Sequence, residues 1–142
     1  MDNNLNMTRP FHLAIPVSNL ELSKKFYENT LGCSIGRSSK NWIDFNFFNH
    51  QLVLHQTNTF QQNKFNNVDN MEVPIPHFGV ILEWDQWHIF SNKIKNEIKF
   101  LINPYIRFEG QKGEQATMFF LDPDKNALEF KAFKNDLMIF EK

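Results

Sequence analysis

The sequence contains the same succession of elements twice, and this internal repeat restricts the fold more than any other feature. His12 and His77 each begin an apolar, strand-like stretch, and they lie 65 residues apart. The helix openings at Leu20 and Asp85 keep the same spacing of 65 residues. Repetition of a whole supersecondary unit predicts two similar modules that are joined in tandem.

Each module is expected to contain a strand, a helix and three further strands. In the first module, Ser18 or Asn19 offers an N-cap oxygen, and Gly32 ends the helix near Thr30. Its expected strands are Phe11–Val17, Cys33–Arg37, Trp42–Phe47 and His50–His55, with a tight hairpin at Asn49-His50. In the second module, Asp85 is the expected helix cap, and the expected strands are Pro76–Leu82, Lys99–Ile102, Glu114–Leu121 and Ala127–Phe133.

Two segments of the sequence have no clear periodicity and are expected to be loops. They are Gln56–Glu72, which connects the modules, and Asn103–Gly113, which lengthens the second module. After the second loop the spacing between matching residues grows, so that Gln51-Leu52-Val53-Leu54 corresponds to Ala127-Leu128-Glu129-Phe130 at an offset of 76. We therefore expect one domain at 10–133, with modules at about 10–56 and 76–133, a linker at 57–75, and tails at 1–9 and 134–142.

Composition narrows the class of protein. The chain has 142 residues, a net charge of −1 and no basic run, which argues against nucleic acid as the main partner. Cys33 is the only cysteine, which excludes an internal disulfide and fits a reducing compartment. No apolar stretch approaches the roughly 20 residues of a membrane span, and the first residues lack a signal-peptide core. A cytoplasmic location is the default expectation.

Strand parity predicts two chemically different faces, because successive side chains in a strand point to opposite sides. One face is apolar and is expected to pack under the helices. The other face carries two histidines and one acid in strand positions, His12, His77 and Glu129, together with Asp44, Asn46, His55 and Lys131. Two imidazoles and one carboxylate form a set of ligands that suits Fe(II) with three coordination positions open. Glu129 has an alternative partner in Lys131 or Arg107.

Three stretches carry a resemblance to a known group of proteins: FHLAIPVSNLELSKKFYENTLGC, PHFGVILEW and FFLDPDKNALEF. In this order they resemble the motifs of the vicinal oxygen chelate superfamily, which includes glyoxalases, bleomycin- and fosfomycin-resistance proteins and extradiol dioxygenases. The chain looks most like the small predicted extradiol-type dioxygenases of that group. The resemblance implies an α+β fold in which two tandem βαβββ modules form an open, barrel-like mixed sheet around a metal-binding cavity.

The resemblance also implies a chemistry. His12, His77 and Glu129 would bind the metal, and Val53 stands where glyoxalase I has a fourth ligand. A three-ligand site favours an Fe(II)-dependent dioxygenase that acts on a catechol-like small molecule and O2, with Zn, Mn, Ni or Co as other metals. His55 is the expected proton acceptor, either as an acid–base group beside the metal or as a fourth ligand, and His50 is the second choice of base. The expected cavity-lining residues, by parity alone, are Asp44, Asn46, Met118 and Lys131.

Two other functions stay open at the level of sequence. One is a glyoxalase-like isomerase, epimerase or thiol transferase that uses another divalent metal. The other is a small-molecule (antibiotic) binding protein without catalysis, although such a protein needs none of the three ligand-type residues. The resemblance further implies a homodimer, in which the modules pair within one chain or swap between two chains.

Overall fold

The computed structural model describes residues 8–58 and 63–142 of the chain. The chain divides into two compact units, Met1–Phe60 and Gln61–Lys142, and each unit contains one of the two modules. Most of the predicted N-terminal tail and part of the predicted linker therefore lie outside the described residues. Within the described ranges, no helix is long and apolar enough to cross a membrane.

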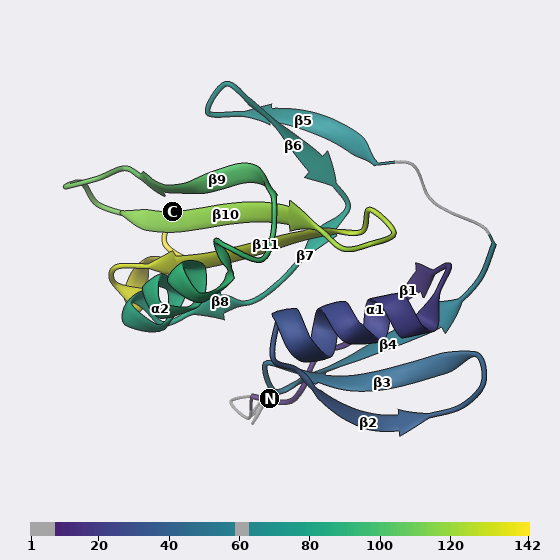
Figure 1. Ribbon diagram of the computed structural model, residues 1–142. Helices are drawn as coiled ribbons and strands as arrows, with labels where there is room; N and C mark the ends of the chain where they lie inside the picture. Colours follow the sequence, from purple (N-terminus) through teal and green to yellow (C-terminus); the bar gives the residue numbers. More distant parts are fainter. Residues whose placement is uncertain (1–7, 59–62) are drawn as a thin grey trace, which may run out of the picture. The chain divides into compact units, whose positions relative to one another are not determined.

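The first unit is a four-stranded mixed sheet with a helix against one face (Figure 1). Its strands lie in the order β1-β4-β3-β2, and only the β1–β4 pair is parallel. The elements in chain order are β1 (His12–Val17), α1 (Leu20–Lys25), a π-helical segment (Phe26–Thr30), β2 (Ser34–Ser38), β3 (Trp42–Phe47) and β4 (His50–Gln56). This is the predicted βαβββ module.

Local sequence signals account for the helix and the hairpin of the first unit. The Asn19 side chain accepts a hydrogen bond from the Leu22 amide, and Gly32 adopts a φ of 79° beyond the helix, as predicted. The β3–β4 turn lies at Phe48 and Asn49, which have φ values of 52° and 69°, one residue earlier than predicted. Positive φ at both central residues matches the twist of a tight hairpin.

The core of the first unit lies between the helix and the sheet. Tyr27 is completely buried, and its ring lies 5.7 Å from that of Phe45 and 6.4 Å from that of Phe47. The other buried apolar residues on this side include Leu20, Leu31, Ile43, Leu52 and Leu54. The predicted apolar face is therefore confirmed, apart from Phe11, which is exposed.

The second unit repeats the arrangement with a broken first strand. Its sheet has the order β7-β11-β10-β9, and β8 also pairs with β11. The elements are β7 (His77–Phe78), β8 (Ile81–Leu82), α2 (Trp84–Ile94), β9 (Phe100–Arg107), β10 (Gln115–Leu121), β11 (Ala127–Phe133) and a short 3₁₀ turn (Asp136–Met138). The α+β class with two βαβββ modules is confirmed, and the mixed sheets are open rather than closed into a barrel.

The predicted continuous strand Pro76–Leu82 is interrupted at Gly79 for a steric reason. A Cβ atom at Gly79 would lie 1.6 Å from the carbonyl oxygen of Glu129 on β11. The backbone of the first strand therefore passes directly against β11 at this point, which only glycine allows. The corresponding residue of the first module is Ala14, and β1 there is continuous.

Helix α2 covers one face of the second sheet. The Trp87 indole donates to the carbonyl oxygen of Phe130, and the Phe90 and Phe130 rings lie 4.8 Å apart. The helix begins at Trp84 after Glu83, not at a cap formed by Asp85 as predicted. Asp85 instead lies in the first turn, where the helix dipole favours a carboxylate.

Both predicted loops contain strands. Residues 64–75 form a hairpin of β5 (Lys64–Val68) and β6 (Met71–Ile75), whose turn residues Asp69 and Asn70 have positive φ. Val73 of this hairpin is buried against Ile102 and Phe119, so the hairpin has an apolar contact that the sequence analysis did not predict. Strand β9 runs to Arg107 through Pro104, which the sheet tolerates because β9 is an edge strand.

Candidate functional site

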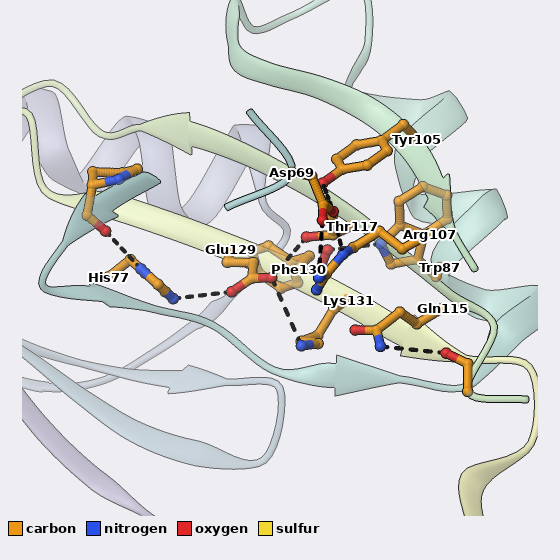
Figure 2. Close-up of polar contacts among 12 residues, drawn as sticks. Asp69, His77, Trp87, Tyr105, Arg107, Gln115, Thr117, Glu129, Phe130 and Lys131 are labelled. Carbon is orange, nitrogen blue, oxygen red and sulfur yellow. Dashed lines mark hydrogen bonds and ion pairs between the residues drawn. The ribbon is translucent and has the colours of Figure 1, made fainter. Parts of the chain in front are cut away.

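His77 and Glu129 face each other on the side of the second sheet that α2 does not cover (Figure 2). The His77 Nε2 atom lies 3.0 Å from Glu129 Oε2. The opposite ring nitrogen, Nδ1, lies 2.7 Å from the carbonyl oxygen of Pro74. Because a carbonyl only accepts, Nδ1 must carry a proton, and Nε2 is the nitrogen that interacts with Glu129.

The Glu129 carboxylate is held by two further groups on the same face. The Thr117 hydroxyl donates to Oε1 over 2.7 Å, and the Lys131 ammonium lies 4.0 Å from the same oxygen. Burial by itself raises the pKa of Glu129, but the hydrogen bonds from His77 and Thr117 outweigh it and lower the pKa below its ordinary value. Glu129 is therefore an ionised, preoriented carboxylate at neutral pH.

The hydrogen bond to Glu129 raises the pKa of His77, against the opposing effect of burial. Without a cation the two side chains form an ion pair. The sequence left open whether Glu129 pairs with Lys131 or with Arg107. Glu129 thus contacts both His77 and Lys131, whereas Arg107 pairs with Asp69.

His12 of the first unit is oriented by a chain of polar side chains. Its Nδ1 atom lies 2.7 Å from Gln51 Oε1, and Gln51 Nε2 donates to Asp44 Oδ2 over 3.3 Å. Since the Asp44 carboxylate only accepts, the Gln51 amide must present its oxygen to His12. The His12 Nδ1 atom is thereby the donor, and Nε2 keeps its lone pair.

Strand pairing places the two histidines in equivalent positions of the repeat. His12 pairs with Gln51 on the parallel neighbour β4, and His77 pairs with Ala127 on the parallel neighbour β11. The predicted offset of 76 between the final strands follows directly from these registers. Val53 then occupies the position in the first module that Glu129 occupies in the second.

Solved structures similar to this chain identify its family. A glyoxalase/bleomycin resistance protein/dioxygenase from Alicyclobacillus acidocaldarius is 32% identical, with 97% of this chain and 99% of that chain covered and a TM-score of 0.76. The chain belongs to the glyoxalase/bleomycin resistance/dioxygenase superfamily. No protein-family model matches the chain, and no curated protein sequence matches it.

Solved structures with lower sequence identity share the fold. The fosfomycin resistance protein FosX from Listeria monocytogenes is 15% identical, with 94% and 99% of the two chains covered and a TM-score of 0.68. The lactoylglutathione lyase from Agrobacterium tumefaciens is 14% identical, with 95% and 99% covered and a TM-score of 0.64. Members of the superfamily typically bind divalent metals.

The side chains present fit a divalent metal in this superfamily member. Two ligands about 2.1 Å from one ion and at right angles to each other are about 3 Å apart. The His77 Nε2 and Glu129 Oε2 atoms have this separation, 3.0 Å. Both histidines also have Nδ1 occupied as a donor, as is usual for metal-binding histidines. Within each unit taken alone, the described residues contain no set of three ligand-type side chains.

The predicted substrate-binding set needs one correction. Met118 is completely buried and pairs with Phe130, so it lies on the face covered by α2, opposite to Glu129. The prediction was off by one position, because Thr117 and Lys131 pair on the opposite face. Lys131 is on the predicted face, and its side chain is 27% exposed.

The predicted residues of the first unit lie on one face of its sheet. Asp44 pairs with Val53, Asn46 with Gln51, and His55 with Trp42. Asp44 supports Gln51, and Asn46 accepts a hydrogen bond from the Asn49 amide in the hairpin turn. His55 is exposed, and His50 accepts the amide hydrogen of Phe11 through Nδ1.

Several residues at the site were not predicted. Thr117 contacts Glu129, and Gln51 contacts His12. Each is a polar residue on the same sheet face as the candidate metal ligand that it contacts, and this position was the signal that could have predicted it. Asp69 binds Arg107 and accepts the Tyr105 hydroxyl, which ties the β5–β6 turn to β9. The contact of the Pro74 carbonyl with His77 could not have been predicted, because the pattern of side chains in a sequence does not indicate which backbone carbonyl accepts a hydrogen bond.

Proposed function

We propose that this protein is a metal-dependent enzyme in which His12, His77 and Glu129 hold one divalent cation. The observation that carries the proposal is the His77–Glu129 pair, with Nε2 and Oε2 3.0 Å apart and His77 Nδ1 engaged by Pro74. The third ligand, His12, is assigned from its equivalent place in the repeat and from its Gln51 contact. Fe(II) is the proposed metal, because two imidazoles and one carboxylate suit it, and Zn, Mn, Ni and Co are the alternatives.

The proposed reaction is extradiol-type ring cleavage of a catechol-like small molecule with O2. Bound at these ligands, the cation would act as a Lewis acid and as a template for two vicinal oxygens. Thr117 and Lys131 keep the Glu129 carboxylate ionised and fixed in direction. Val53 contributes no ligand atom at the position equivalent to Glu129, which supports a site with open positions for both substrates.

His55 is the proposed proton acceptor for the substrate hydroxyl. It lies two residues beyond Val53 on the same face of β4, about 7 Å farther along the strand. Its imidazole is exposed and makes no hydrogen bond within the described part of the chain, so a ligand can reach it. His50 is a weaker choice, because its Nδ1 atom already accepts the Phe11 amide.

Oxygen uptake tests the proposal. The full chain would be loaded anaerobically with Fe(II), mixed with a panel of catechols, and followed with an oxygen electrode after O2 is admitted. We expect uptake with at least one catechol, abolished in Glu129→Gln and retained in Glu114→Gln, a matched change at a carboxylate that pairs with Lys134 instead. Fe(II) binding without O2 uptake on any catechol would exclude the dioxygenase and leave a metal-dependent isomerase or transferase.

A further inference from the structure

Lys131 is a cation on the face of the candidate metal site, and it would share the Glu129 carboxylate with the metal, with Lys131 at Oε1 and the metal at Oε2. Its ammonium lies 4.0 Å from Glu129 Oε1 and 5.3 Å from the centre of the Phe133 ring. Its side chain is only 27% exposed. A partly buried ammonium keeps an anionic partner where one is available, because the loss of hydration must be offset.

Other acidic groups on this face are already engaged. Thr117 pairs with Lys131 on one side and with Tyr105 on the other, so the three side chains form one row across β11, β10 and β9 (Figure 2). At the far end of the row, Asp69 binds Arg107 and accepts the Tyr105 hydroxyl. These contacts lower the pKa of Asp69, the largest cause being its hydrogen bond with Arg107, so Asp69 stays with that pair.

Charge balance then indicates what the site lacks. The Glu129–Lys131 pair and the Asp69–Arg107 pair are each neutral in sum. A divalent cation at Glu129, with neutral histidines, adds two positive charges to these two pairs, which together sum to zero. A vicinal diol that loses one proton offsets one charge, and a second anionic group is needed for the other.

We propose that the substrate carries an acid group, such as a carboxylate, in addition to its two vicinal oxygens, and that Lys131 binds this acid group. The inference rests on the proposed function, since it takes Glu129 as a metal ligand. An oxygen that accepts from Lys131 Nζ at about 2.8 Å lies no more than about 7 Å from Glu129 Oε1.

A second observation supports a polar ligand on this face. Gln115 lies in the next row, paired with Phe133 and Arg107, and is 8% exposed. Its Oε1 atom is buried without a hydrogen-bond partner among the described residues. A buried acceptor without a donor is costly, and a ligand group that donates to Gln115 Oε1 would remove that cost.

Paired ligands test the proposal. Binding of 3,4-dihydroxybenzoate and 4-methylcatechol, which differ in one carboxylate, would be measured calorimetrically on the anaerobic, Fe(II)-loaded full chain. We expect the acid to bind about 10-fold more tightly or better. Lys131→Met should remove this preference and Lys131→Arg should keep it. The matched control is Lys134→Met, because Lys134 is an exposed lysine that pairs with Glu114.

Fe(II) affinity gives a second readout that separates a specific effect from a loss of fold. Removing the ammonium beside a ligand oxygen should raise the Fe(II) affinity of Lys131→Met about threefold, whereas a damaged fold would lower it. Equal binding of both ligands by the wild type, an unchanged preference in Lys131→Met, or a fall in its Fe(II) affinity would overturn the inference while leaving the metal site intact. If neither ligand bound the Fe(II)-loaded chain, the proposed function itself would fail, and the inference with it.

Discussion

At the scale of single residues, the two candidate ligand histidines are held in the same way by different groups. Gln51 accepts from His12 Nδ1, and the Pro74 carbonyl accepts from His77 Nδ1. Such contacts fix the ring and leave Nε2 as the basic nitrogen. The use of a side chain in one module and a backbone carbonyl in the other explains why sequence comparison of the modules could not find both.

Gln51→Leu tests the role of His12 without touching the histidine. Loss of the acceptor should weaken metal affinity about 10-fold, since mutation of a group that hydrogen-bonds to a metal ligand typically lowers metal affinity about 10- to 100-fold. Gln56→Leu is the matched control, because Gln56 is also exposed on β4 and lies five residues farther along the strand. Anaerobic titration with Fe(II) measures both. An unchanged affinity in Gln51→Leu would argue that His12 is no ligand.

The His77–Glu129 pair gives the metal-free protein a defined dependence on pH. The raised pKa of His77 means that its contribution to stability is complete below the ordinary value of 6.5 and is lost as the pH rises through the raised pKa. The lowered pKa of Glu129 means that its contribution is complete above the ordinary value of 4.5 and is lost as the pH falls through the lowered pKa. Urea unfolding should therefore show the largest stability difference between wild type and Glu129→Gln from pH 4.5 to 6.5. A difference that stayed constant from acid to alkaline pH would contradict the pair.

At the scale of elements, the break between β7 and β8 is the main departure from the repeat. Gly79→Ala would drive a Cβ into the Glu129 carbonyl, so β11 would have to move. We expect a loss of at least about 3 kcal/mol in the free energy of unfolding, together with weaker metal binding. Gly36→Ala is the control, because its Cβ would meet Asp44 Cβ at 3.3 Å, and it should cost less than about 1 kcal/mol. Tolerance of both alanines would show that β7 does not pass against β11.

The turn of the β5–β6 hairpin contacts β9 through the Asp69 side chain. Asp69→Asn removes the charge that binds Arg107 and weakens the contact with Tyr105, so unfolding should require about 1–2 kcal/mol less free energy. Asp85→Asn, at an exposed position in the first turn of α2, should change stability by less than about 1 kcal/mol. The two variants can be compared by urea unfolding, and equal effects would mean that the Asp69 contacts contribute nothing specific.

At the scale of the whole molecule, the sequence predicted the repeat and most of its strands because both depend on local pattern. β3 and β11 have the predicted bounds, and the offset of 76 holds in the strand registers. The hairpin at residues 64–75 was missed because its alternation is weak: only Val73 and Pro74 are buried on β6. Met118 was misplaced because every residue from Gln115 to Phe120 is buried, so burial alone does not distinguish the faces.

The sequence predicted the candidate metal ligands, but not the groups that hydrogen-bond to them. A histidine that recurs at one place in a repeat is visible in sequence, as His12 and His77 are. Thr117, Gln51 and the Pro74 carbonyl act through tertiary contacts that pattern does not encode. The ion pairs of Lys131 and Arg107 likewise depend on which strands are neighbours.

The central claim is that His12, His77 and Glu129 together hold one divalent cation. Anaerobic Fe(II) titration of the wild type and of His12→Ala, His77→Ala and Glu129→Ala tests it most directly. We predict one ion for each chain in the wild type and affinity at least about 100-fold weaker in every single variant, because each removes one of three ligands. Full Fe(II) affinity in any one of the three variants would contradict the three-ligand site.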